Sequence, residues 1–188
     1  ANLPPRPRLV FTGRLHPQKN LGVLLHAWAT VCATTPGSLL LAGDGPEELS
    51  LRQLCRELEI TDRVGFLGHL DDPSELLRAC DLFVLPSVAE GMSNSLLEAM
   101  ATGLPAAVSR IGGNTDLVTA DENGVLIDPK DQVGWIAQLR RLVGDEALRL
   151  RLGRSALDRI TTDYALPIVV ERNEQLYKRL LGCRNSNA

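Results

Sequence analysis

Two hydrophobic patterns alternate along the chain from Leu9 onward. Short, continuously apolar runs are typical of strands buried on both faces, and runs that are apolar every three or four residues are typical of amphipathic helices. After Asn20, a residue type that favours the N-cap position, Leu21, Leu24 and Trp28 follow the helical period. The alternation predicts an α/β fold, in which a Rossmann-like, mostly parallel sheet carries helices on both faces.

The same pattern gives bounds for each element. Strands are predicted at residues 9–12, 38–42, 64–67, 82–85, 106–109 and 125–127. Helices are predicted from residue 21 to a stop at Pro36-Gly37, and at residues 47–58, 73–80, 94–102, 131–143, 145 to about 161 and 168–181. Gly112 and Gly113 are expected to form a turn between the last two strands.

Length and composition fit one globular domain. The chain has 188 residues, of which 44% are hydrophobic and 23% charged, enough to bury a core without disulfides or metals. Residues 1–8 hold three prolines and are expected to be an extended interdomain linker, with the domain at 9–181 and a disordered tail at 182–188. A domain entered through such a linker, in a chain that begins with Ala1, is expected to be the second half of a longer protein.

Charge and cysteine content narrow the function classes. The net charge of −3 disfavours the phosphate-backbone binding of DNA- and RNA-binding proteins, so no nucleic-acid partner is expected. No apolar run reaches the length of a membrane span, and no charged-then-apolar leader precedes the first strand. The cysteines and histidines lack metal-ligand spacing. The expectation is a cytoplasmic domain with reduced thiols and no metal site.

Four loops carry most of the residues that can act on a ligand. They follow strands at residues 13–19, 43–46, 86–94 and 110–113. Because crossovers in a parallel sheet are right-handed, the loops after the strands all lie at one edge, where open sheets bind ligands. We therefore expect these loops to surround one site.

The first two loops offer cations and glycines. Arg14 follows the first strand directly, and Lys19 precedes a helix whose free N–H groups add positive potential. Such a pair suits a diphosphate, although from spacing alone two solvated surface cations are the plainer interpretation. Gly43 and Gly45 either let a ligand approach the backbone or, more simply, serve a tight turn.

Two carboxylates flank the start of the helix predicted at residues 94–102. Glu98 completes a capping box with Ser95, is simply solvated, or accepts hydrogen bonds from the two hydroxyls of a ribose. Glu90 precedes Gly91 in a loop whose N–H groups at residues 92–94 can bind a sugar hydroxyl or a leaving phosphate. The simpler alternative for Glu90 is a solvated loop carboxylate.

Taken together, these residues resemble the C-terminal, donor-binding domain of the GT-B glycosyltransferases, specifically the retaining family 4 (glycosyl transferases group 1). The likeness covers residues 8–181. Its motifs occur in the order of the family: G-R-L-x-x-x-K-N at 13–20, G-D-G-P at 43–46, G-x-L at 68–70, D-L-F-V-L-P-S at 81–87, E-x7-E at 90–98, A-M-A-x-G-x-P at 99–105, G-G at 112–113 and G-x-L at 124–126. One such motif is weak evidence, but the ordered set is specific.

The resemblance implies a site for a nucleotide-activated sugar. Arg14 and Lys19 would hold the diphosphate, Glu98 the ribose, the backbone from Gly68 to Leu70 the base, and Glu90 the sugar. The implied catalytic residues are Arg14, Lys19 and Glu90. The implied substrate-binding residues are Gly13, Gly43, Gly45, Gly68, Leu70, Gly91, Met92, Ser93, Asn94, Ser95, Leu96 and Glu98.

The resemblance also implies a reaction. The expected enzyme is a retaining, metal-independent hexosyltransferase of glycan biosynthesis that needs no cofactor and uses a UDP- or GDP-linked sugar. Its acceptor is a glycan, a lipid-linked glycan or a small molecule. Met92 stands where the family often has an aromatic residue, which leaves the donor sugar open.

One half of such an enzyme is missing from this chain. The family's N-terminal domain supplies the acceptor site, so the isolated domain is expected to be inactive, and a peripheral contact with the inner face of a membrane would come through the longer protein.

Two other functions stay open: a nucleotide-sugar epimerase of the same architecture, and a binding module without catalysis. The E-x7-E run with its continuation favours transfer over the first, and the intact Arg14, Lys19, Glu90 and Glu98 disfavour the second.

Overall fold

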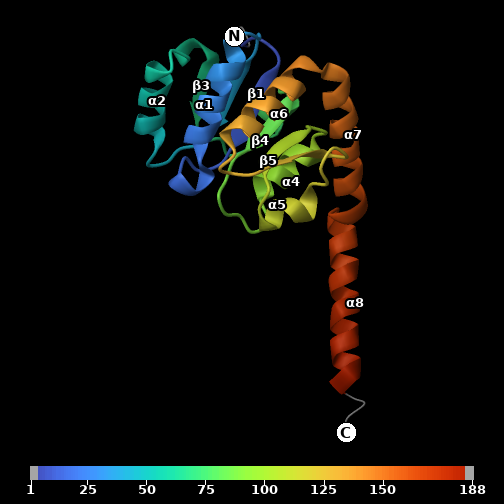
Figure 1. Ribbon diagram of the computed structural model, residues 1–188. Helices are drawn as coiled ribbons and strands as arrows, with labels where there is room; N and C mark the ends of the chain where they lie inside the picture. Colours follow the sequence, from blue (N-terminus) through green and yellow to red (C-terminus); the bar gives the residue numbers. More distant parts are fainter. Residues whose placement is uncertain (1–3, 185–188) are drawn as a thin grey trace.

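The described residues form a sheet of six parallel strands (Figure 1). The computed structural model describes residues 4–184, and its strand order is β3-β2-β1-β4-β5-β6. Each neighbouring pair is parallel. The strands are β1 (Arg8–Thr12), β2 (Ser38–Ala42), β3 (Val64–Gly68), β4 (Leu82–Leu85), β5 (Ala106–Ser109) and β6 (Gly124–Ile127). The predicted α/β fold with a parallel sheet is confirmed.

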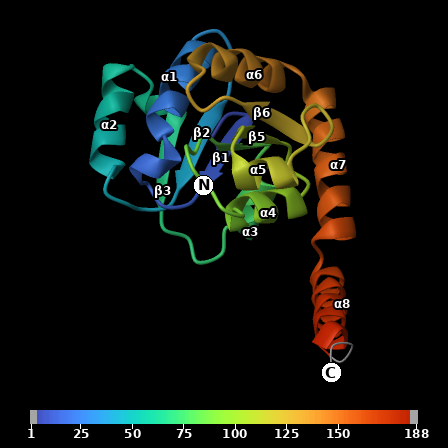
Figure 2. The same cartoon turned by 60° about the horizontal axis from the view of Figure 1, so that its bottom comes forward.

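Helices cover both faces of this sheet. On one face α1 packs against α6, and on the other α4 packs against α7 (Figures 1 and 2). The α-helices are α1 (Leu21–Cys32), α2 (Glu48–Glu57), α3 (Ser74–Arg78), α4 (Asn94–Ala101), α5 (Gly112–Leu117), α6 (Gln132–Gly144), α7 (Glu146–Asp163) and α8 (Leu166–Arg184). Two short 3₁₀ helices, η1 (Pro17–Lys19) and η2 (Thr61–Arg63), lie between them.

Burial explains why the strands were recognisable. Every residue of β1, β2, β4 and β5 is buried, because helices cover both faces of these strands and leave no solvent side to be polar. β3 lies at the edge of the sheet and is only partly buried. The core between sheet and helices includes two fully buried tryptophans, Trp28 from α1 and Trp135 from α6.

One local prediction was wrong, one was confirmed in position only, and one open alternative is excluded. Gly112 and Gly113 begin the helix α5 and do not form a simple turn. Asn20 is the N-cap residue of α1, but its side chain does not cap; the residue is left-handed, with φ of 53°, because it also ends η1, and its amide donates to Pro129 O at 3.1 Å. The N-cap of α4 is Ser93 and not Ser95, which removes the capping box.

The two ends of the chain differ slightly from expectation. β1 begins at Arg8, the last residue of the predicted linker, and α8 continues to Arg184, inside the predicted tail; residues 185–188 lie outside the described part. α8 extends away from the body of the domain, past the edge formed by the carboxyl ends of the strands (Figures 1 and 2). No helix in residues 4–184 is long and apolar enough to cross a membrane.

Candidate functional site

A cavity of about 430 Å³ lies at the carboxyl ends of β1, β2 and β3, beside the first turn of α4. Such an edge is where open parallel sheets bind ligands. Seven of the predicted site residues line it: Gly13, Arg14, Gly43, Leu70, Asn94, Ser95 and Glu98. Six further residues line it that were not among the predicted site residues, although Asp44 and His69 lie inside predicted motifs: Thr12, Ala42, Asp44, His69, Asp71 and Pro73. Most of these directly end or follow a strand, which is the signal that could have identified them.

The loops around this cavity are joined by backbone hydrogen bonds. Gly13 N donates to Ala42 O at 2.9 Å, and Gly43 N donates to Gly68 O at 2.6 Å. A Cβ atom on Gly43 would lie 1.9 Å from Gly13 O, and its φ of +141° is one that residues with side chains rarely adopt. Glycine at position 43 is therefore required by the contact between two loops, and the same residue also faces the cavity.

Arg14 and Glu98 both reach the cavity from its wall. Arg14 is exposed at the end of β1, and Glu98 is exposed on α4. Within residues 4–184 the Glu98 carboxylate makes no hydrogen bond or ion pair, while Ser93 Oγ caps α4 by accepting from Leu96 N at 3.4 Å. Glu98 is thus free to accept hydrogen bonds from a ligand.

The first turn of α4 supplies further donors. Ser93 is buried and its hydroxyl lies 3.0 Å from Ser95 Oγ. Leu96 is buried in the core and its N–H already donates to Ser93, so Leu96 does not line the cavity. Among the described residues, this leaves the backbone N–H groups of Asn94 and Ser95 as the free donors of the first turn. They add positive potential at that wall.

Lys19 and Glu90 lie outside this cavity and bind each other. The Lys19 Nζ–Glu90 Oε1 distance is 2.5 Å, and Ser87 Oγ donates to the same carboxylate oxygen at 2.6 Å. Only 18% of the Lys19 side chain and 10% of the Glu90 side chain are exposed. Gln18 Nε2 also donates to Ala89 O at 2.7 Å, and Val88 N donates to Gln18 O at 2.9 Å, so η1 and the loop after β4 are connected at three points.

The loop after Glu90 rests on the start of α5. A Cβ atom on Gly113 would lie 1.5 Å from Gly91 O and 3.1 Å from Met92 N. Gly113 therefore has no room for a side chain, because two backbone segments touch there. Gly91 and Met92 are exposed and do not line the cavity, and neither do Gly45 and Gly68.

The wall at the end of β3 is formed by residues 69–73. Leu70 exposes 37% of its surface and offers an apolar contact, and His69 Nε2 lies 3.3 Å from Asp71 Oδ1. No group of three or more His, Cys, Asp or Glu side chains in residues 4–184 is arranged to hold a metal ion. The arrangement as a whole offers a cation, helix N–H groups, a free carboxylate and an apolar wall around one cavity.

Comparison with known proteins gives one family and, among solved structures, one fold. The family model for glycosyl transferases group 1 matches residues 6–145. The chain is 33% identical over 173 residues to N-acetyl-alpha-D-glucosaminyl L-malate synthase of Bacillus anthracis, covering 92% of this chain and 45% of that protein.

Two solved structures share the fold. The structure of Anabaena HepE in complex with UDP superposes with a TM-score of 0.83 at 26% identity, covering 94% of this chain and 49% of that one. The C-terminal domain of a group 1 glycosyl transferase (LpcC) from Francisella tularensis superposes with a TM-score of 0.79 at 23% identity, covering 87% of this chain and 89% of that one. The chain thus spans about half the length of the Bacillus relative and of HepE.

Proposed function

The chain belongs to the family of glycosyl transferases group 1, and from that membership we propose that it is the donor-binding half of an enzyme that transfers a sugar from a nucleoside diphosphate sugar to an acceptor. The observation that carries the proposal is the exposed Glu98 carboxylate, which has no partner within residues 4–184 and lines the same cavity as Arg14. A carboxylate acceptor beside a cation suits a ligand that presents both hydroxyls and phosphate.

We assign the parts of the donor to the parts of the cavity. Glu98 accepts hydrogen bonds from the ribose hydroxyls, and the base lies against Leu70 and the backbone of residues 68–70. The diphosphate meets Arg14 and the N–H groups at the start of α4, since anions bind well at helix N-termini. A UDP- or GDP-linked sugar fits this assignment, and HepE, a protein of the same fold, has been crystallised with UDP.

Lys19 is assigned to the far end of the diphosphate, and Glu90 is assigned to the sugar. Their ion pair is mostly shielded from water, so each side chain is already held in one geometry before a ligand arrives. The carboxylate of Glu90 directs Lys19, and Ser87 directs Glu90. We propose that this arrangement reduces the side-chain entropy lost on binding.

The proposed chemistry is a retaining, same-face displacement in which the leaving phosphate assists the acceptor. Arg14, Lys19 and the first turn of α4 stabilise the negative charge that develops on the leaving diphosphate. In this proposal they do so without a metal ion or other cofactor. The Glu90–Met92 loop (residues 90–92) binds the sugar and holds it in position for the reaction.

The acceptor half is proposed to lie across the cavity and along α8. This helix extends past the edge of the sheet formed by the carboxyl ends of the strands, the edge at which the cavity lies. It exposes a run of apolar side chains: Leu166, Val170, Leu176, Tyr177, Leu180 and Leu181. The Bacillus relative and HepE are about twice as long as this chain. An N-terminal domain that faces the cavity would also cover this stripe. The acceptor it carries is proposed to be a glycan, a lipid-linked glycan or a small molecule.

A reducing compartment agrees with the state of the cysteines. Cys32, Cys55 and Cys80 are buried free thiols. Burial raises the pKa of the Cys55 thiol to about 11 and that of Cys80 to about 12, so they stay protonated and unreactive. We propose a cytoplasmic reaction, with any peripheral membrane contact made through the longer protein.

A binding panel followed by a transfer assay tests the function. Calorimetry with UDP, GDP and ADP sugars should find one nucleotide class that binds the 188-residue chain. The full-length protein should then transfer a radiolabelled sugar from that donor to a crude acceptor extract, and the chain alone should not.

Each outcome separates the proposal from its alternatives. Conversion of the donor sugar by the full-length protein without any acceptor would identify an epimerase, an alternative that the comparisons do not support. Binding without transfer by the full-length protein would leave the binding module. Transfer by the isolated chain at the full-length rate would contradict the division into two halves.

A further inference from the structure

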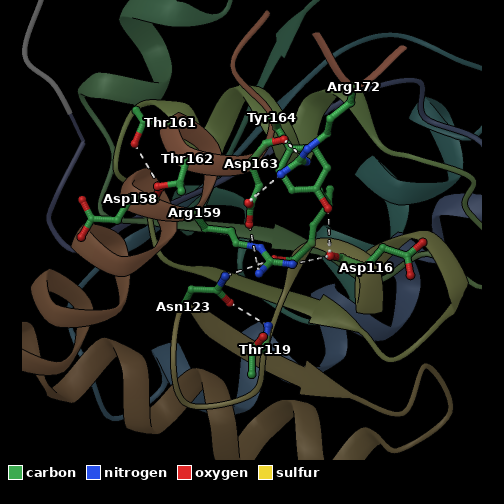
Figure 3. Close-up of polar contacts among 11 residues, drawn as sticks. Asp116, Thr119, Asn123, Asp158, Arg159, Thr161, Thr162, Asp163, Tyr164 and Arg172 are labelled. Atoms are coloured by element: carbon green, nitrogen blue, oxygen red, sulfur yellow. Dashed lines mark hydrogen bonds and ion pairs between the residues drawn. The ribbon is translucent and has the colours of Figure 1, made fainter. Parts of the chain in front are cut away.

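The short helix α5 connects two distant parts of the structure. At its start, the backbone of Gly113 contacts that of Gly91 so closely that a Cβ atom on Gly113 would not fit. At its end, the carbonyl oxygen of Asp116 accepts two hydrogen bonds from α7 and the residue that follows it. Arg159 Nη2 donates at 3.3 Å and the Tyr164 hydroxyl at 3.1 Å (Figure 3).

A cluster of charged and polar residues organises these two donors. We call it the junction cluster; it consists of Asp116, Arg159, Asp163, Tyr164 and Arg172. Arg159 pairs with Asp163 at 3.2 Å, and its guanidinium lies 6.0 Å from the centre of the Tyr164 ring. Arg172, on α8, donates to both the carbonyl and the carboxylate of Asp163, at 2.8 and 3.2 Å (Figure 3). The cluster therefore spans α5, α7 and α8.

The length of α5 makes these contacts important. The helix has six residues, and a helix this short has no stability of its own in water. Its last carbonyl groups have no partners within the helix, so a cation and a hydroxyl at that end satisfy one of them and complement the helix dipole. Asn114 holds the other side by donating to Ser109 O at 3.0 Å. Asn123 Nδ2 also donates to Leu117 O at 3.1 Å, and Leu117 is buried in the core. The position of α5 is therefore set by this packing together with the contacts at its two ends.

We propose that Arg159 and Tyr164 are positioning residues for the Glu90–Met92 loop. They hold α5 from its C-terminal end, and α5 in turn holds the backbone of residues 90–92, because no side chain separates Gly113 from Gly91 to absorb a shift. The consequence for sugar binding rests on the proposed function, in which this loop contacts the donor sugar. The link to the loop itself does not.

Hydrogen–deuterium exchange of the 188-residue chain without ligand tests the link directly. The variants are Arg159→Met and the milder Tyr164→Phe. Arg159→Met removes a hydrogen bond from a charged group and should speed amide exchange about 10-fold in residues 90–93 and 112–117. Tyr164→Phe removes a hydrogen bond from a neutral hydroxyl and should speed exchange in the same residues roughly 3- to 5-fold. Exchange in residues 13–20 should not change. Arg151→Met is the matched control, because Arg151 lies on the same helix and donates to the carbonyl of Asp121 at 3.1 Å.

Calorimetry with UDP and UDP-glucose adds a functional readout. In both variants the affinity for UDP-glucose should fall roughly 2- to 30-fold more than that for UDP, the range expected for coupling through packed elements. Faster exchange confined to residues around 159–164, with residues 90–93 unchanged, would overturn the proposal. Changed exchange at 90–93 in a chain that binds none of the UDP, GDP and ADP sugars would keep the link and refute the proposed function.

Discussion

Glu98→Ala separates ligand binding from helix capping. The Glu98 side chain is exposed on the cavity wall and makes no hydrogen bond or ion pair within the described residues. Its removal should therefore change the free energy of unfolding by less than about 0.5 kcal/mol, or about 1–2 °C in melting temperature for a domain of this size. Binding should suffer much more, because hydrogen bonds from the ribose to a charged acceptor contribute about 1.5–3 kcal/mol, or roughly 10- to 100-fold in affinity.

Two further variants make this test selective. Glu75→Ala also removes an exposed glutamate, near but outside the cavity, and should change neither quantity. Ser93→Ala removes the side chain that caps α4 and should lower the melting temperature by about 2–4 °C, corresponding to about 1 kcal/mol. The assay is calorimetric titration with the nucleotide sugar beside a thermal melt. If Glu98→Ala kept full affinity, or behaved like Ser93→Ala, the assignment of Glu98 to the ribose would be refuted.

Three further predictions concern the phosphate end and the loop contacts. Arg14→Ala should weaken binding of UDP far more than binding of uridine, with a smaller difference at high salt because Arg14 is exposed; equal losses in titrations of both ligands would contradict its role. Glu90→Gln should lower the free energy of unfolding by about 1–2 kcal/mol in denaturant melts, because it leaves Lys19 without its charge partner. The double variant with both Glu90→Gln and Lys19→Met should lose less than the sum of the two single variants; strict additivity would show that the ion pair contributes nothing. Gly113→Ala should cost about 3 kcal/mol or more in the same melts, because its Cβ would lie 1.5 Å from Gly91 O, whereas Gly144→Ala, where a Cβ meets nothing within 4 Å, should be neutral or stabilising; similar costs for the two would refute the packing argument.

The sheet could be predicted closely because its strands are simple. β2, β4 and β5 occupy the predicted residues, since strands buried on both faces have continuously apolar sequences. α5 could not be predicted from its sequence, because Gly112-Gly113 favours a turn locally. Tertiary contacts stabilise the helical form of this segment: the Gly91 backbone touches one end, and Arg159 donates a hydrogen bond to the other.

The candidate site shows the same division between local and distant information. That Arg14 and Glu98 would share a cavity followed from loops meeting at one edge of a parallel sheet, and both line it. The cap of α4 could not be settled, since Ser93 and Ser95 are equally good capping residues and only the backbone decides between them. The ion pair between Lys19 and Glu90 joins residues 71 positions apart, and no local pattern could indicate that the two groups neutralise each other.

The Lys19–Glu90 ion pair has a consequence for selectivity. A lone cation beside the cavity would attract inorganic phosphate and any other small anion. With Glu90 as its internal counterion, Lys19 is neutralised in the empty state, and a ligand that offers only phosphate must compete with a carboxylate 2.5 Å away. A sugar nucleotide offers phosphate oxygens to Lys19 and hydroxyl donors to Glu90 together. We therefore expect the pair to act as a filter that favours the intact donor over its fragments.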